Sequence, residues 1–249
     1  MSPLKRCDHS NSSEGVRSFA SFGCAALLLV VSSPPLHAME SFEYRPDALP
    51  QEAQPAWQQL GAGKQASVTV EGRVLRVISG VPEFTQWRIG HGSQESGRGF
   101  GDSQAMPIEP GGSLTVDLRV RLSTESDPSD QVAGFNVWVT NGEVSATLAL
   151  LPGYVSFGGV KDPKPVESAD WADYRIVVEG SRITYLFLGT SVVVDLSSSP
   201  GKDDGRFIAF GVPQWTEAGD AVPMRGFEIQ SVRWYPGQAL YAPPEAPSP

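Results

Sequence analysis

The chain has 249 residues, of which 40% are hydrophobic and 19% charged, and it carries a formal net charge of −9 with a pI near 4.8. This length favours one large domain, and 26 Gly with 21 Pro favour short strands joined by turns over a helical protein. No more than two Lys or Arg residues are adjacent, which excludes a basic patch for nucleic acid.

Residues 1–38 have the pattern of a secretory signal peptide. Three Lys or Arg residues precede an apolar stretch at 19–31, and Leu36-His37-Ala38 offers a cleavage site before Met39. The apolar core is short for a membrane span, at about 13 residues, and two prolines follow it. We therefore predict export to the periplasm or the medium, with cleavage and no membrane span afterwards. A retained membrane anchor is the alternative.

Both cysteines, Cys7 and Cys24, fall inside this leader segment. A mature chain that starts near Met39 would be free of cysteine. The sequence therefore predicts no disulfide, no thiolate metal ligand and no cysteine nucleophile.

Short strands follow one another along the rest of the chain. Residues 39–65 form an irregular, Pro-containing N-terminal segment that joins the domain. We predict strands, in chain order, at 66–70, 73–78, 84–89, 113–123, 132–140, 143–151, 154–157, 171–179, 182–188, 191–195, 206–212 and 226–235. No segment shows helical periodicity over three turns. The sequence thus predicts an all-β domain at 66–236, folded as a two-sheet antiparallel jelly-roll sandwich. The Pro-rich tail at 237–249 is predicted to be disordered or a linker stub.

Three strand motifs carry a resemblance to a known superfamily. They are W-x-x-Y-R-I-V-V-x-G at 171–180, RFIAFGV at 206–212 and FEIQSVRWYPG at 227–237. With them, residues 42–236 resemble the concanavalin A-like lectin/glucanase superfamily, and most of all its laminin-G-like and 3-keto-disaccharide hydrolase-like bacterial domains. The resemblance implies a jelly roll with one polar sheet face on which saccharides lie. Each motif is also one that strand packing alone requires.

The segment around Asn141-Gly142 predicts a tight hairpin and a ligand face. A two-residue loop would pair Trp138 with Ser145 and Asn136 with Thr147. The Val and Leu residues that alternate with them then fill the core. The side chains of Trp138, Ser145, Asn136 and Thr147 share the polar face. An exposed indole beside amides and hydroxyls suits a sugar ring. The alternative is that a loop such as 91–107 covers Trp138.

Other candidate ligand residues are Trp215, in the loop at 213–223, and two arginines. Arg119 and Arg121 alternate with core residues on the strand at 113–123 and could join the face of Trp138, where Arg grips uronates or sulfates. The alternative for both is a solvated strand face with cross-strand ion pairs. The remaining large aromatics are predicted to lie in the core: Trp57, Trp87, Trp171, Tyr174 and Trp234.

Metal and catalytic signals are weak, and we predict no cofactor. Paired acids at 127/130, 203/204 and 217/220 could ligate Ca²⁺, but none has the density of a calcium loop. Only His91 lies well inside the mature chain, which argues against a His-based zinc site. The Glu-x-Asp-x-x-Glu string of the glucanases is absent, so any paired acids would come from the turns and loops that hold Glu83, Glu95, Asp102 and Glu143.

These observations favour a secreted glycan-binding protein with a carbohydrate or polysaccharide partner. Two alternatives stay open. One is a hydrolase or lyase on polysaccharide or disaccharide that uses loop carboxylates or His91. The other is a structural interaction domain of the cell envelope without a sugar ligand.

Overall fold

The computed structural model describes most of the chain after the leader, namely residues 40–61, 66–79, 85–91, 103–126, 133–158, 160, 162–195, 205–212 and 224–243. The leader, both cysteines, Trp215 and the three acid pairs at 127/130, 203/204 and 217/220 lie outside these ranges. Among the described residues, no helix is long and apolar enough to cross a membrane.

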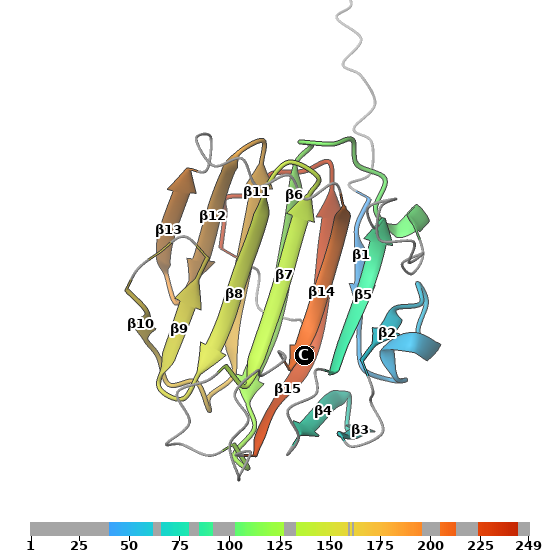
Figure 1. Cartoon of the computed structure of the whole chain (residues 1–249), viewed down its shortest axis with the longest axis vertical. Helices are drawn as coiled ribbons and strands as arrows, with labels where there is room; N and C mark the ends of the chain where they lie inside the picture. Colours follow the sequence, from blue (N-terminus) through green and yellow to red (C-terminus); the bar gives the residue numbers. More distant parts are fainter. Residues whose placement is uncertain are drawn as a thin grey trace, which may run out of the picture. The chain divides into compact units, whose positions relative to one another are not determined.

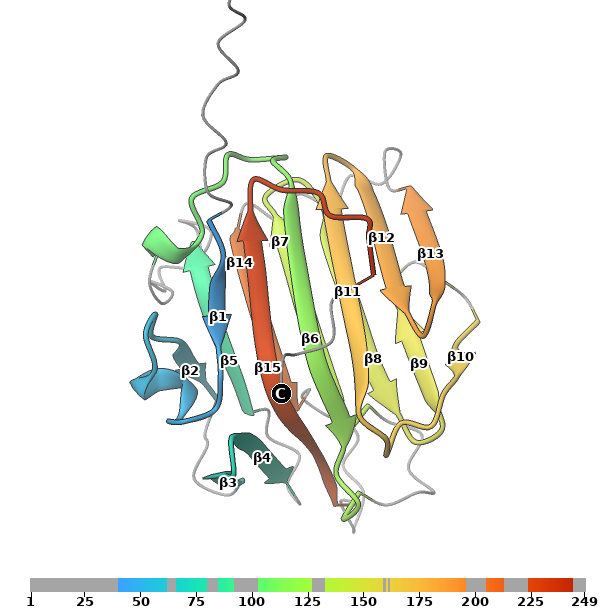
Figure 2. The same cartoon turned by 180° about the vertical axis from the view of Figure 1, so that it is seen from behind.

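Two antiparallel sheets pack face to face, and Figures 1 and 2 show one from each side. Sheet A runs in the order β13 (Thr190–Asp195), β12 (Arg182–Phe187), β11 (Ala172–Glu179), β6 (Leu114–Leu122), β15 (Arg225–Pro236), β4 (Val74–Ser79) and β3 (Ser67–Glu71), with β1 (Phe42–Tyr44) also paired to β15. Sheet B runs β10 (Lys164–Pro165), β9 (Tyr154–Phe157), β8 (Ser145–Leu151), β7 (Phe135–Asn141), β14 (Arg206–Val212), β5 (Thr85–His91) and β2 (Gln58–Leu60). Two short 3₁₀ turns, Pro50–Glu52 and Ser103–Ala105, complete the described elements. The predicted jelly-roll sandwich is confirmed.

The core between the sheets is built by alternation along each strand. β6 buries Leu114, Val116, Leu118, Val120 and Leu122 and turns the residues between them away from sheet B. Trp57, Trp87, Tyr174 and Trp234 are fully buried, as predicted.

Trp171 is not a core residue, and that prediction is wrong. It lies three positions before the buried Tyr174, so it points to the opposite face of the sheet. The guanidinium of Arg121 covers its ring at 4.7 Å from the centroid.

The hairpin between β7 and β8 is longer than the predicted two-residue loop. Its register pairs Thr140 with Ser145 and Trp138 with Thr147, two residues away from the prediction. Asn141 causes the shift: its fully buried side chain accepts hydrogen bonds from the backbone N–H groups of Glu143 and Val144, at 3.0 Å each. An even shift keeps every side chain on its predicted face.

Residues 237–243 lie across the outer surface of sheet A, whereas the tail was predicted to be disordered or a linker stub. Thr115 Oγ1 donates to the carbonyl of Gln238 and accepts from the N–H of Leu240, at 2.9 and 3.0 Å. Arg175 donates to the carbonyl of Ala242, and the hydroxyl of Tyr241 donates to Glu179 at 2.6 Å. The described part of the tail is therefore part of the folded domain.

Candidate functional site

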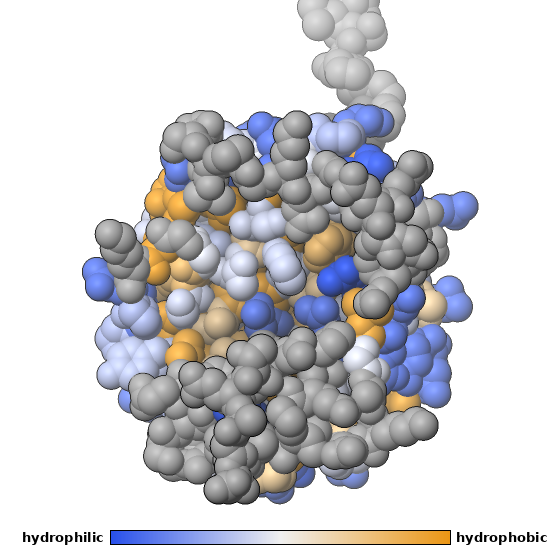
Figure 3. Space-filling model, viewed as in Figure 1, coloured by the Kyte–Doolittle hydropathy of each residue, from blue (hydrophilic) through white to orange (hydrophobic). Residues whose placement is uncertain are grey.

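The outward side of sheet B is the candidate site, and we call it the Trp138 face. Alternation places these side chains on it: Gln86 and Arg88 of β5, Phe207 and Ala209 of β14, Asn136 and Trp138 of β7, and Ser145 and Thr147 of β8. Figure 3 looks onto this face, where polar and apolar side chains lie side by side.

Trp138 lies in the middle strand of this face and is 38% exposed. The strand register gives it Ala209 on one side and Thr147 on the other. Its ring meets the ring of Phe207 edge to face, with centroids 6.1 Å apart. The Ala209 side chain beside it is fully buried, so the surface open to a flat ligand is the exposed 38% of the Trp138 side chain itself.

Arg88 supplies positive charge on the same row. It pairs with Ala209 across the sheet, and its guanidinium carbon lies 4.2 Å from the centroid of the Phe207 ring. A guanidinium over an aromatic face is held in place by the ring quadrupole. The row Arg88, Ala209, Trp138 and Thr147 therefore combines a cation, a buried methyl group, an indole and a hydroxyl.

The predicted polar neighbours of Trp138 all lie on this face. Thr147 is directly opposite Trp138, Ser145 lies one row toward the turn, and Asn136 lies one row away from it, opposite Ala149. The Oδ1 atom of Asn136 is buried and has no hydrogen-bond partner among the described residues. The N–H of Thr147 donates to the hydroxyl of Tyr185, at 3.1 Å, which fixes β8 to sheet A through the core.

Arg119 and Arg121 do not join the Trp138 face, and that prediction is wrong. Both project from β6 in sheet A, on the opposite side of the sandwich. Arg119 donates to Asp173 and Gln230 at 2.5 and 2.8 Å, and Arg121 donates twice to Glu228. Burial raises the pKa of Asp173 above its ordinary value, and Arg119 only partly offsets this. These arginines belong to cross-strand ion pairs, the alternative stated for them.

Arg88, Gln86 and Phe207 are residues of the face that sequence reasoning missed. The signal was present in β5, because Trp87 and Ile89 are core residues and alternation then turns Gln86 and Arg88 outward. Trp215 lies outside the described residues, so its role stays a prediction.

Within the described ranges no group of three or more His, Cys, Asp or Glu residues could hold a metal ion. Glu83, Glu95 and Asp102 lie outside those ranges. Glu143 is in the β7–β8 turn, and His91 ends β5 with a partly buried side chain.

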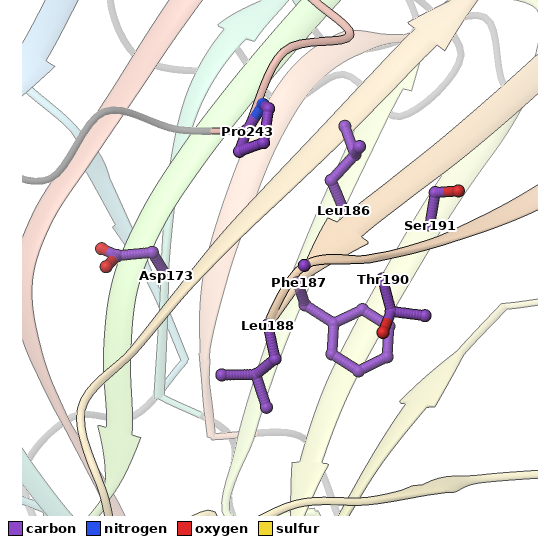
Figure 4. A pocket seen from close by; sticks show the side chains of 8 residues that line it. Asp173, Leu186, Phe187, Leu188, Thr190, Ser191 and Pro243 are labelled. Carbon is purple, nitrogen blue, oxygen red and sulfur yellow. The ribbon is translucent and has the colours of Figure 1, made fainter.

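A pocket of about 320 Å³ lies on the other side of the sandwich, at the β12–β13 hairpin. Figure 4 shows Leu186, Leu188 and Pro243 around it, with Asp173 of β11 across from them. Asp173 is the acid that pairs with Arg119. This pocket is separate from the Trp138 face, because it opens on sheet A.

No protein-family model and no curated protein matches the chain. Among solved structures it is similar to the botulinum neurotoxin serotype C1 binding domain, with 7% identity over 75% of this chain and 45% of that one and a TM-score of 0.48. It is also similar to alginate lyase A1-II′ of polysaccharide lyase family 7, with 9% identity over 67% and 82% of the two chains and a TM-score of 0.45. A third structure comes from work on endo-acting O-glycanases of the human gut microbiota, with 12% identity, 80% and 98% coverage and a TM-score of 0.48. Likeness at this level carries no argument about function.

Proposed function

We propose that the Trp138 face binds glycans without catalysis, and that the protein does so after export. One observation carries the proposal: an indole is 38% exposed in the middle strand of a sheet face, between hydroxyl, amide and guanidinium groups. Large aromatics are normally buried in a core that has room for them. Here β7 turns Trp138 outward while the core of the same strand is filled by Phe135, Val137 and Val139.

The chemistry of the face matches a sugar ring. The indole offers an apolar surface for the C–H face of a pyranose, and Thr147, Ser145 and Asn136 offer groups that bond hydroxyls. Arg88 would favour a sugar that carries a carboxylate or sulfate near the stacked ring. The leader pattern at 1–38 supports a setting outside the cytoplasm, where such polymers occur.

Replacing Trp138 with alanine is expected to weaken glycan binding by about 30-fold or more, which corresponds to the roughly 2 kcal/mol of a hot-spot aromatic. The measurement is a glycan-array screen, followed by titration of the best ligand against the wild type and the variant. The fold should be kept, because Trp138 is exposed and lies outside the core.

Tyr241→Ala is the matched control, since Tyr241 is an aromatic of similar exposure that lies on sheet A. It should bind as the wild type does. The proposal is contradicted if Trp138→Ala binds the glycan as tightly as the wild type does, or if the wild type binds no glycan on the array.

A further inference from the structure

The edge strands of the two sheets are not protected equally. In sheet B, β10 is two residues long and contains Pro165, and β2 has three residues. In sheet A, β3 turns Ser67, Thr69 and Glu71 outward, all of them polar and exposed. Short strands, prolines and charges are the usual means of preventing an edge from pairing with another chain.

β13 is neither short nor interrupted by proline, and its only charged residue is at its end. It is a six-residue strand, TSVVVD, without Pro, Lys or Arg, and it pairs only with β12 among the described strands. It is the outermost strand of sheet A in both views (Figures 1 and 2). Val193, in its middle, is 49% exposed on the outer face.

The hairpin register fixes which backbone groups of β13 point away from β12. Phe187 pairs with Thr190 around the two-residue turn Leu188-Gly189, whose φ angles are 46° and 72°. In such a hairpin the pair beside the turn exchanges hydrogen bonds, and the direction then alternates along the strand. The N–H and C=O groups of Ser191, Val193 and Asp195 therefore point away from β12.

An apolar patch lies beside this edge on the outer face of sheet A. Leu188 is 65% exposed at the hairpin tip and holds a left-handed φ, which is unfavourable for a leucine. Together with Leu186 and Pro243 it lines the pocket of Figure 4. The sequence thus places exposed aliphatic side chains where a solvated hairpin would normally have polar ones.

We propose that β13 binds β13 of a second copy of this chain, antiparallel, around a two-fold axis at Val193. The register is self-complementary. Val193 lies opposite its own copy, and Ser191 lies opposite Asp195 on the outer face. On the inner face Val192 lies opposite Val194, and both extend the core. In this register the pairs that exchange backbone hydrogen bonds between the two copies are Val193 with Val193 and Ser191 with Asp195. These are the residues whose backbone groups point away from β12.

The symmetry of this pairing has a consequence for the Trp138 face. When identical residues lie opposite each other in a sheet, the two-fold axis is normal to the sheet, so each copy keeps the same side up. Both Trp138 faces then point to one side of the dimer. A polymer or a glycan-covered surface would meet two binding faces together, which raises avidity without a new contact.

A lysine at the proposed axis tests the dimer. In sedimentation of the full chain, the wild type is expected to be a dimer and Val193→Lys a monomer, since two lysines would face each other across the axis. Thr69→Lys is the matched control, because it adds the same charge to β3, an edge strand of sheet A far from β13 in the strand order, and it should remain a dimer. A monomeric wild type overturns the proposal, and so does a dimeric Val193→Lys.

A cysteine at the axis tests the register even if the lysine variant folds poorly. Hydrogen-bonded antiparallel pairs have Cα atoms about 5.5 Å apart, within the range that a disulfide spans. In a full chain with Cys7→Ser and Cys24→Ser, we expect Val193→Cys to form a covalent dimer under mild oxidation and Thr69→Cys to stay monomeric on a denaturing gel. Equal cross-linking of the two variants, or none at position 193, contradicts the proposal.

Discussion

Replacing Asp117 with alanine is expected to lower the free energy of unfolding by about 3–5 kcal/mol. Its two carboxylate oxygens accept hydrogen bonds from Nε and Nη2 of Arg175 at 2.6 and 2.7 Å, and the Arg175 side chain is only 6% exposed. The third nitrogen of this guanidinium, Nη1, donates to the carbonyl of Ala242, in the segment that crosses sheet A. Removal of Asp117 leaves a buried cation without its counter-ion, and urea unfolding would measure the loss.

Two comparisons make this result specific. Glu125→Ala removes a partner of Arg76 from a pair whose side chains are 53% and 40% exposed, and it should cost no more than about 1 kcal/mol. The double variant Asp117→Leu with Arg175→Met should recover much of the loss, because it removes both charges together. If Asp117→Ala were no more harmful than Glu125→Ala, the ion pair would not have the buried role assigned to it.

Replacing Asn141 with alanine is expected to lower the free energy of unfolding by about 3 kcal/mol or more, since several backbone groups would lose their partners. Its Oδ1 accepts from the N–H groups of Glu143 and Val144, and its Nδ2 donates to the carbonyls of Gly112 and Gly180 at 3.1 Å each. One side chain thus closes the β7–β8 turn and ties it to two other loops. Thermal and denaturant unfolding would measure the effect.

Asn136→Ala is the matched control for that experiment. Asn136 is on the same strand, but its Oδ1 makes no hydrogen bond with the described residues. Its replacement should cost at least about 2 kcal/mol less than that of Asn141, because an unpaired buried acceptor is removed rather than a paired one. Equal losses for the two variants would mean that the turn does not depend on the Asn141 side chain.

The outward position of Trp138 was predictable although the hairpin register was not. Alternation fixed Val137 and Val139 as core residues, and the face of Trp138 followed from that alone. The register depended on the turn. The buried amide of Asn141 accepts hydrogen bonds from two backbone N–H groups and so stabilises a longer turn than the two-residue loop that Asn-Gly usually forms. The observed pairing differs from the predicted one by two residues, an even number, so each side chain still lies on its predicted face of the sheet.

Which sheet a strand joins was not predictable from its own residues. Alternation on β6 correctly separates Arg119 and Arg121 from the core, but nothing in that strand indicates that its neighbours are β11 and β15. Long-range pairing decides this, and it places the two arginines opposite the Trp138 face. The ordered path of residues 237–243 was not predictable for a similar reason, since its backbone is held by Thr115 and Arg175, far away in sequence.

The most direct test of the central claim is a titration of the ¹⁵N-labelled protein with the glycan that the array selects, followed through the indole N–H signals. The Trp138 signal, assigned by its loss in Trp138→Phe, is expected to shift and saturate. The signals of the buried Trp57, Trp87 and Trp234 should stay in place. Saturable binding that leaves the Trp138 signal unmoved would contradict the claim that this face is the glycan site.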